Sequence, residues 1–240
     1  MNLDRLFSMT EKLRIQAIGD PFWIPEKGAF EYTNQSVKVV AVLKAIRAAQ
    51  GIKSLYLLCA NGLFIDMGAI YRCVTDCVAE VYFLLEKYPG TSSTVEKFVN
   101  SFFEGTIDNY LNKKTEPVQT KKIHNAMVRT LTGLEQDEET RTRTLRIYKT
   151  FCGYTHADYA HIMQVYGGIW PDLSFNTAGV PSTQQREMHF QLVEQAYLSV
   201  LYLIGFSASR FGLAELYSEV VRYCEPLQAD GLQSSPSGHP

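Results

Sequence analysis

Residues 53–88 read KSLYLLCANGLFIDMGAIYRCVTDCVAEVYFLLEKY, the longest apolar segment in this chain of 240 residues. Its apolar side chains recur at helical spacing, and the alternating pattern of a half-buried strand is missing. Asn61-Gly62 either divides the segment into two helices or kinks one, since an internal glycine costs about 1 kcal/mol relative to alanine. A segment this long and this apolar predicts helices at the centre of the fold.

The sequence on both sides of this segment also favours helices. Apolar spacing and capping residues predict them over residues 3–18, 34–50, 93–110, 120–135, 137–152, 157–166, 183–206 and 213–223. Gly51 is expected to stop the second of these. We therefore predict an all-α protein, a single-domain bundle of seven to nine helices over residues 1–225. The polar composition of residues 226–240 predicts a disordered tail.

Two connecting segments stand out. In Phe22-Trp23-Ile24-Pro25 the flanking prolines are expected to exclude a regular element, so that the aromatic rings plug the core from outside. The loop over residues 167–182, GGIWPDLSFNTAGVPS, is long for a compact domain, and loops of this length are often functional or act as lids.

Composition narrows the class of protein. The formal net charge of -2 gives no global argument for nucleic acid as a partner, although a local basic patch could bind it. Five cysteines without a CxxC pair predict reduced thiols in a cytoplasmic protein. The longest apolar run, Ala196 to Ala208, is interrupted by Ser199, Gly205 and Ser207 and falls short of the roughly 20 residues that cross a bilayer. The N-terminus does not resemble a signal peptide. We expect no membrane partner and no cofactor, because nucleotide-binding and nucleophile motifs are missing.

Arg72, Asp76 and Glu80 follow one another at intervals of four residues. On a helix they span about 80° of arc, and we call them the charged stripe. The stripe is either a solvated face, with ion pairs of about 0.2–0.5 kcal/mol each, or the wall of a cleft. In a cleft, Glu80 or Asp76 could act as a base and Arg72 could bind an anion.

The segment YKTFCGYTHADYAH, residues 148–161, carries the densest set of reactive side chains. His156 either titrates near neutral pH in a groove or serves as a capping or core histidine. Asp158 is expected to cap the next helix. A metal site with His161 is the weaker alternative, because the five-residue spacing matches no helical metal motif, and we predict no metal. The Cys152 thiol, four residues before His156, could be activated by it.

Two helix faces allow more than one interpretation. Arg141, Arg143, Arg146 and Lys149 form a basic patch that, with Tyr148 and Tyr154, either binds RNA or is a solvated face. The apolar stripe Tyr197, Val200, Leu201 and Ile204 is either core or a dimer interface.

Two short motifs carry a resemblance. The helix with Ile70-Tyr71-Arg72, Glu80 and Phe83-Leu84-Leu85 resembles the arginine, glutamate, apolar helix of a bacterial all-helical family of unknown function. Tyr148 with Tyr154-Thr155-His156 resembles that family's later tyrosine–histidine motif, and the layout agrees over residues 36–205. That family is similar to the HEPN superfamily and to abortive-infection proteins.

The resemblance implies a dimeric helical bundle that cleaves RNA without a metal, through an arginine followed by four to six residues and a histidine. This chain departs from that motif, because Lys149 lies seven residues before His156 and the nearest upstream arginine is Arg146. If the activity holds, His156 is the general acid or base, and Lys149 or Arg72 stabilises the phosphorane charge.

We therefore expect a HEPN-like ribonuclease or a stress or phage-defence factor, with RNA or a protein as partner. The residues expected to bind are Tyr148, Tyr154, Arg146, Asp158 and His161. The alternative is a non-catalytic module in which the charged stripe and the loop over residues 167–182 recognise a ligand or a protein. A metal hydrolase built from carboxylates and histidines is a third, weaker hypothesis.

Overall fold

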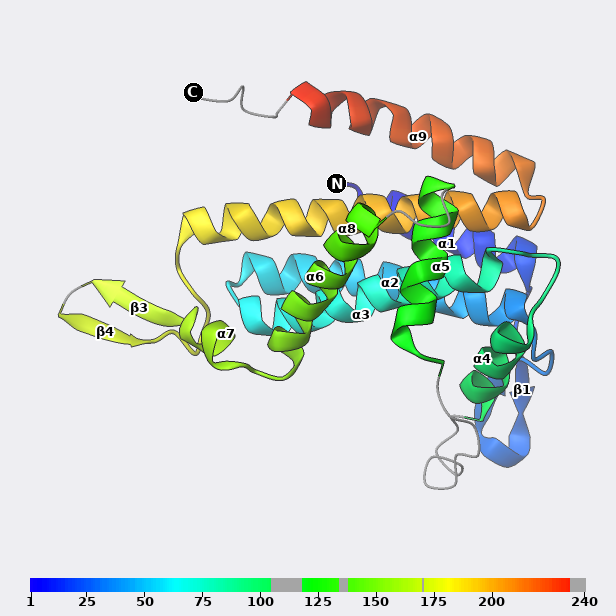
Figure 1. The fold of residues 1–240 in the computed structure, drawn as a ribbon, viewed down its shortest axis with the longest axis horizontal. Coiled ribbons are helices and arrows are strands. Elements are labelled where there is room, and N and C mark those ends of the chain that lie inside the picture. Colours follow the sequence, from blue (N-terminus) through cyan, green and yellow to red (C-terminus); the bar gives the residue numbers. More distant parts are fainter. Residues whose placement is uncertain (105–117, 134–137, 170, 234–240) are drawn as a thin grey trace.

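The computed structural model describes residues 1–104, 118–133, 138–169 and 171–233 (Figure 1). The helices are α1 (Leu3–Ala17), α2 (Val37–Ala60), α3 (Phe64–Leu85), α4 (Ser93–Phe103), α5 (Thr120–Thr132), α6 (Glu138–Thr155), α7 (Tyr159–Met163), α8 (Thr183–Arg210) and α9 (Ala214–Gln233). The strands are β1 (Phe22–Ile24), β2 (Ala29–Glu31), β3 (Tyr166–Ile169) and β4 (Asp172–Phe175). Within these residues the nine helices and two small hairpins confirm the all-α fold class.

Helices α2 and α3 form the centre of the bundle, joined by a tight turn at Asn61-Gly62. Of the two alternatives, two helices or one kinked helix, the first is found, because α2 ends at Ala60 and α3 begins at Phe64. Gly62 in the turn has a φ of 71°, a conformation that glycine adopts without strain. The predicted stop at Gly51 is wrong, because α2 continues through it to Ala60. A Cβ atom at Gly51 would overlap Cγ2 of Val74 on α3. This glycine therefore allows a close approach of two helices rather than ending one.

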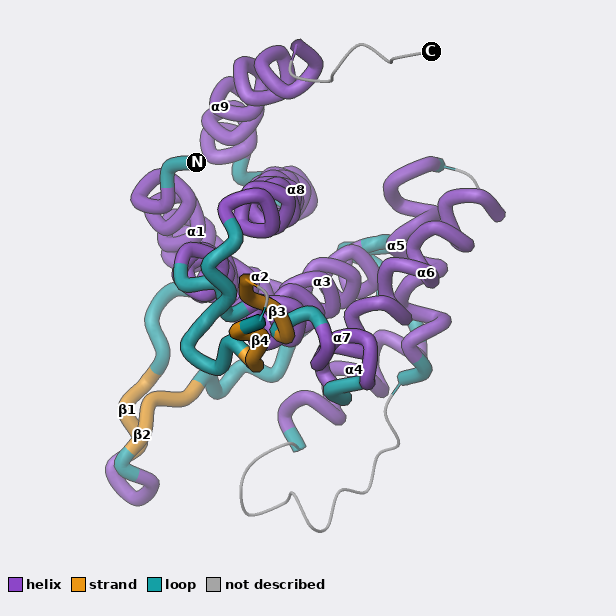
Figure 2. The backbone as a smooth tube through the Cα atoms, turned by 90° about the vertical axis from the view of Figure 1, so that its left-hand side faces the viewer, coloured by secondary structure: helices purple, strands orange, loops and turns teal. Residues whose placement is uncertain are grey.

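The other long helices close around this pair. Figure 2 shows α8 and α1 on one side of α2 and α3, and α5 and α6 on the other. The stripe Tyr197, Val200, Leu201 and Ile204 is at most 2% exposed, which confirms its interpretation as core. By length and composition α8 is the one described helix that could cross a membrane, yet 56% of its most apolar window is buried inside the protein. Core helices meet the same criteria, and the expected absence of a membrane partner stays a prediction.

The connector after α1 is a β-hairpin, so the expectation of no regular element there is wrong. Strands β1 and β2 pair antiparallel with Trp23 opposite Phe30, and their rings lie 5.0 Å apart. Pro25 falls just after β1, where it interrupts no ladder hydrogen bond. The aromatic rings do not plug the core, since Phe22, Trp23 and Phe30 are 52–66% exposed. Trp23 and Phe30 pack on each other across the hairpin instead.

The segment before α8 is more ordered than a long loop. Helix α7 is only five residues long, and the predicted helix over 157–166 gives way to β3 at Tyr166. After the β3–β4 hairpin the chain returns to the core, where Val180 is buried and its N–H donates to the Gly62 carbonyl at 3.0 Å. The hairpin projects from the end of α3 opposite α4 (Figure 1), and its role as a lid stays a prediction.

Some of the remaining predicted helix bounds are confirmed, and others lie outside the described residues. Helices α5 and α6 begin and end close to their predicted bounds. Helix α9 continues past residue 225 to Gln233 with Pro226 inside it, and the rest of the predicted tail, 234–240, lies outside the described residues. The predicted end of the α4 helix at residue 110 also lies outside them. All five cysteines are free, and Cys73 is exposed.

The contact between α2 and α3 leads to a prediction. Gly51→Ala should lower the free energy of unfolding by about 1–3 kcal/mol, because overpacking against Val74 outweighs the gain of about 1 kcal/mol in helix propensity. Urea unfolding of this variant, of Val74→Ala and of the double variant measures the coupling. Val74→Ala should relieve the overlap. A Gly51→Ala protein more stable than the wild type would contradict the close packing.

Candidate functional site

The charged stripe faces a cavity rather than bulk water. This charged cavity has a volume of about 490 Å³ and lies between α2, α3, α4 and α5. It is lined by Lys44, Arg72, Asp76, Ala79, Glu80, Phe98, Ser101, Phe102, Val118, Thr120, Ile123 and His124. All three residues of the stripe are among them, so the stripe is the wall of a cleft. The i, i+4 spacing on α3 is what brings them to one side.

Arg72 is held from three directions. Its Nε donates to both carboxylate oxygens of Asp76 at 2.9 Å, and its Nη1 donates to Sγ of Cys152 at 2.7 Å. Its guanidinium carbon lies 3.4 Å from the ring centroid of Tyr148, a stacked cation–π contact. Because Cys152 and Tyr148 belong to α6, this one side chain ties α6 to α3. Only 14% of the Arg72 side chain is exposed.

Glu80 is paired across the cavity with a lysine of α2. Lys44 Nζ lies 2.6 Å from Glu80 Oε2, and the two side chains are about one-fifth exposed. This oxygen is buried, and the ammonium of Lys44 is its partner. Burial raises the pKa of Glu80, and the ammonium of Lys44 opposes that rise. Lys44 also lies 5.5 Å and 5.8 Å from the ring centroids of Phe102 and Phe98.

His124 of α5 is a member of the site that the sequence did not reveal. It is 8% exposed, and burial lowers its pKa below the ordinary value, so the ring is neutral near pH 7. Its ring meets the Tyr148 ring edge-on, with centroids 4.9 Å apart. A histidine next to Ile123 on the apolar face of a predicted helix was the available signal. Nothing in the sequence paired it with α3.

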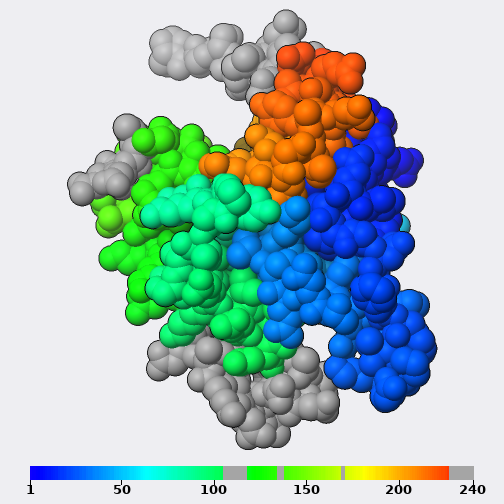
Figure 3. Space-filling model, turned by 90° about the vertical axis from the view of Figure 1, so that its right-hand side faces the viewer, coloured from blue at the N-terminus to red at the C-terminus, as the bar shows by residue number. Residues whose placement is uncertain are grey.

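A second cavity, the apolar cavity, lies on the neighbouring face of α3. Its volume is about 310 Å³, and α3, α5, α6 and α8 surround it. It is lined by Tyr71, Val74, Thr75, Val78, Ala79, Tyr82, His124, Met127, Leu131, Thr144, Ile147, Tyr148, Ala196, Ser199 and Tyr202. On the surface, Figure 3 shows a notch between the green atoms of α5 and α6 and the orange atoms of α8 and α9.

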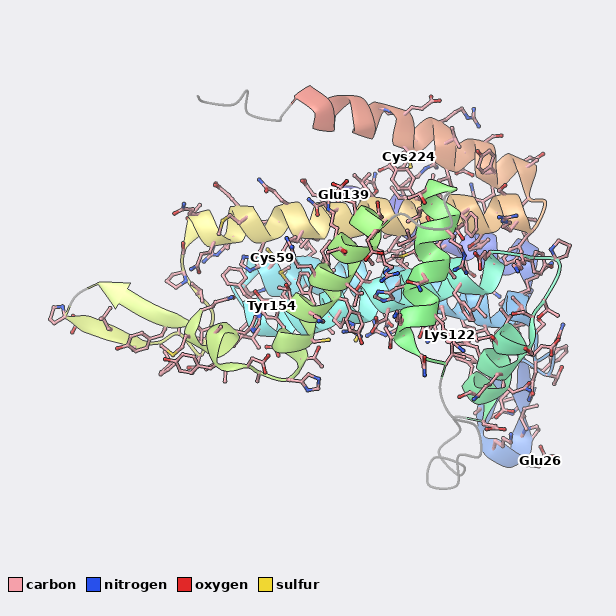
Figure 4. The ribbon with its side chains drawn as sticks, viewed as in Figure 1. Glu26, Cys59, Lys122, Glu139, Tyr154 and Cys224 are labelled. Atoms are coloured by element: carbon pink, nitrogen blue, oxygen red, sulfur yellow. The ribbon has the colours of Figure 1, made fainter. Side chains whose placement is uncertain are left out.

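The segment over residues 148–161 covers the C-terminal part of α6 and the start of α7. Tyr148 belongs to the cavity walls, whereas the ring of Tyr154 packs on Gly68 of α3 and its hydroxyl donates to Gln164 at 2.9 Å. His161 packs against Tyr154 and Gly153, with a buried Nδ1 that has no hydrogen bond to a described residue. Figure 4 labels Tyr154 near the C-terminal end of α6, apart from Lys122 of α5.

The other residues singled out in that region face solvent. Asp158 occupies the N-cap position of α7, as predicted, although its side chain makes no capping hydrogen bond. Arg146, Lys149 and His156 are exposed. Among the described residues no hydrogen bond or ion pair joins His156 to the charged stripe, and His156 lines neither cavity. The structure therefore separates the two halves of the sequence-based site, with Cys152 and Tyr148 as the link between them.

No three His, Cys, Asp or Glu side chains in the described parts of the chain gather closely enough to hold a metal ion. Comparisons with protein-family models, with curated proteins and with solved structures found no match to this chain.

Replacing Arg72 should loosen α6. Arg72→Met should lower the free energy of unfolding by about 1–3 kcal/mol and speed amide hydrogen exchange in α6 more than in α2, because it removes charge-assisted bonds to Asp76 and the contact with Cys152. Arg141→Met is the matched control. Its ion pair with Glu138 is largely exposed, so it should change stability by no more than about 0.5 kcal/mol. Equal exchange in the two variants would show that Arg72 does not hold α6.

Proposed function

We propose that this chain is a non-catalytic, all-helical binding protein that takes a small uncharged molecule into the charged cavity. The observation that carries the proposal is the charged cavity itself, a hollow of about 490 Å³ whose wall holds two ion pairs, Lys44–Glu80 and Arg72–Asp76. Charged and polar side chains that line a hollow of this kind can hydrogen-bond the polar groups of a small molecule.

The balance of charge in the cavity supports an uncharged ligand. Arg72 is paired with Asp76, and Lys44 with Glu80, so the cations and anions of the lining cancel. A ligand with net charge would add a buried charge without a counterion, which is costly. Hydrogen bonding to a neutral hydroxyl or amide meets no such cost. The volume of about 490 Å³ lies within the range of about 300–1,000 Å³ usual for small-molecule pockets.

An RNA-directed activity of the HEPN-like kind is the second candidate, and one observation favours it. Arg146, Lys149 and His156 are exposed, and their spacing places them within about 80° of arc along α6. The helical bond from the His156 N–H to the Cys152 carbonyl, 3.0 Å, carries the helix geometry as far as His156. Two cations on the same helix face as a histidine, about 15 Å and 10 Å from it along the axis, are a surface that suits successive phosphates, with His156 as the proton-transfer group.

Removing Lys44 should weaken binding to the charged cavity. Titration with glycerol, myo-inositol, nicotinamide and uridine, followed by NMR of backbone amides, should shift resonances of α3, α4 and α5 for at least one probe. Lys44→Met should weaken the binding of that probe by up to about tenfold, because Glu80 loses its counterion and is protonated more readily. Lys53→Met, an exposed lysine on the same helix, is the control and should bind as the wild type does. Probes that shift no cavity resonance, or that bind both variants equally, would refute the proposal.

The RNA-directed alternative makes a separate prediction. Purified protein in the presence of EDTA should degrade single-stranded RNA, and His156→Ala should lower the rate by about 100-fold or more, the usual contribution of a general acid or base. Tyr159→Ala, at a residue that is 80% exposed three positions further along, should leave the rate unchanged. RNA that stays intact with the wild-type protein would remove this candidate.

A further inference from the structure

The apolar cavity is elongated along one face of α3. Its α3 residues recur at alternating intervals of three and one, the spacing of a single helix face: Tyr71, Val74, Thr75, Val78, Ala79 and Tyr82. From the first to the last of them the helix rises about 16 Å. On the walls, Leu131 of α5 and Ile147 of α6 are 56% and 42% exposed, so the cavity is open to solvent at its rim.

The lining of this cavity carries no formal charge. Within the described parts of the chain, no aspartate, glutamate, lysine or arginine lines it, and burial lowers the pKa of His124, so that this ring is neutral near pH 7. The hydroxyls of Thr75 and Ser199 donate to carbonyl groups of their own helices. A charged ligand would find no counterion here, which favours an uncharged and mostly apolar occupant.

Two aromatic rings of the lining are held in place from outside the cavity. Tyr71 stacks on Phe151 with ring centroids 4.2 Å apart, and the ring of Tyr82 lies 4.8 Å from that of Phe206. Phe151 and Phe206 do not line the cavity, so both tyrosine rings are positioned before a ligand enters. Fixed rings favour a flat aromatic ligand, because aromatic pairs are attractive beyond the gain from burial alone.

The same two tyrosines provide polar groups that have no partner. Tyr71 and Tyr82 are 7% and 5% exposed, and neither hydroxyl makes a hydrogen bond to a described residue. Burial raises the pKa of Tyr71, and burial with the nearby Tyr202 raises the pKa of Tyr82 to about 12, so both hydroxyls keep their protons at pH 7. Buried polar groups in proteins generally have a partner, and a polar substituent of a ligand would supply one.

The volume of the cavity sets the size of the ligand. An apolar cavity of about 150 Å³ holds benzene, and this one is about 310 Å³. An occupant of about two fused rings therefore fills it.

We propose that the apolar cavity is a binding site for an uncharged aromatic molecule of about two fused rings that carries a hydroxyl or N–H group. The rings lie along α3 between Tyr71 and Tyr82, and the polar group forms a hydrogen bond with one of these two hydroxyls. Ala79 and His124 form the wall that separates this site from the charged cavity. The inference thus goes beyond the proposed function, and either can fail without the other.

A set of four ligands tests the class of molecule, by NMR titration of the wild-type protein. 2-Naphthol should shift amide resonances of α6 and α8 and bind at least about tenfold more tightly than phenol, which buries less apolar surface. Decahydro-2-naphthol, saturated and not flat, should bind about fivefold more weakly than 2-naphthol. 2-Naphthoate should bind at least about tenfold more weakly, because its charge has no counterion in the cavity. Resonances of α4, which borders the charged cavity alone of the two, should not move.

Filling the cavity gives the protein side of the test. Val78→Phe places a ring midway along the α3 face and should abolish the binding of 2-naphthol, while far-ultraviolet circular dichroism confirms the helical fold. Ser199→Phe, at an exposed position on the rim, puts less strain on the fold and should weaken binding at least about tenfold. Gln195→Phe, one turn earlier at an exposed position of α8 outside the lining, is the matched control and should bind as the wild type does.

The role of the hydroxyls is tested by removing both of them. The double variant Tyr71→Phe, Tyr82→Phe should bind 2-naphthol up to about tenfold more weakly than the wild type and naphthalene equally well. The same loss for both ligands would show that the hydroxyls do not recognise the polar group.

The possible results separate this inference from the proposed function. If 2-naphthol shifts no resonance of α6 or α8, or binds Val78→Phe and Ser199→Phe as it binds the wild type, the aromatic site is refuted, whatever the charged cavity binds. Binding of 2-naphthoate as tight as that of 2-naphthol would also overturn it. If 2-naphthol behaves as expected and the polar probes shift nothing around the charged cavity, the aromatic site stands and the proposed function fails.

Discussion

Helix α3 is enclosed by α2, α5, α6 and α8, and this enclosure is the constraint on which the site depends. A helix packed on several sides cannot turn its charges to bulk water, so Arg72, Asp76 and Glu80 must find partners inside the bundle. Glu80 pairs with Lys44 on α2, and Arg72 contacts Cys152 on α6 in addition to its pair with Asp76 on α3 itself. The polar side chains of α3 therefore determine where its neighbours lie, as well as filling the cavity wall.

The close contact of α2 and α3 has a second effect on the same surface. With Gly51 against Val74, the two backbones approach at the middle of α2, and Lys44 on α2 comes within 2.6 Å of Glu80 on α3. Burial then raises the pKa of the carboxyl while the nearby ammonium keeps it paired. The close approach at Gly51 and the Lys44–Glu80 ion pair thus lie on the same interface between α2 and α3.

The sequence predicted what depends on local spacing. The i, i+4 interval placed Arg72, Asp76 and Glu80 on one face of a helix, and continuous apolar sequence identified α2, α3 and α8. Long-range partners have no local signal, so Lys44 and His124 were missed, and His156 was joined to a site that it does not touch. Gly51 was misread because a glycine that ends a helix and a glycine that admits a neighbouring helix look the same in sequence. The first hairpin was missed because its prolines flank the strands rather than interrupt them.

The exposed hairpin near the N-terminus has a practical consequence for work in solution. Trp23 is one of two tryptophans in the chain and is 52% exposed on β1, where its ring contacts Phe30 rather than the helical core. Its fluorescence therefore reports the environment of the hairpin, and a two-stranded hairpin can lose its structure before the bundle does. Emission from Trp23 and far-ultraviolet circular dichroism follow different parts of this molecule, and coincident transitions would be needed before a single free energy of unfolding is assigned.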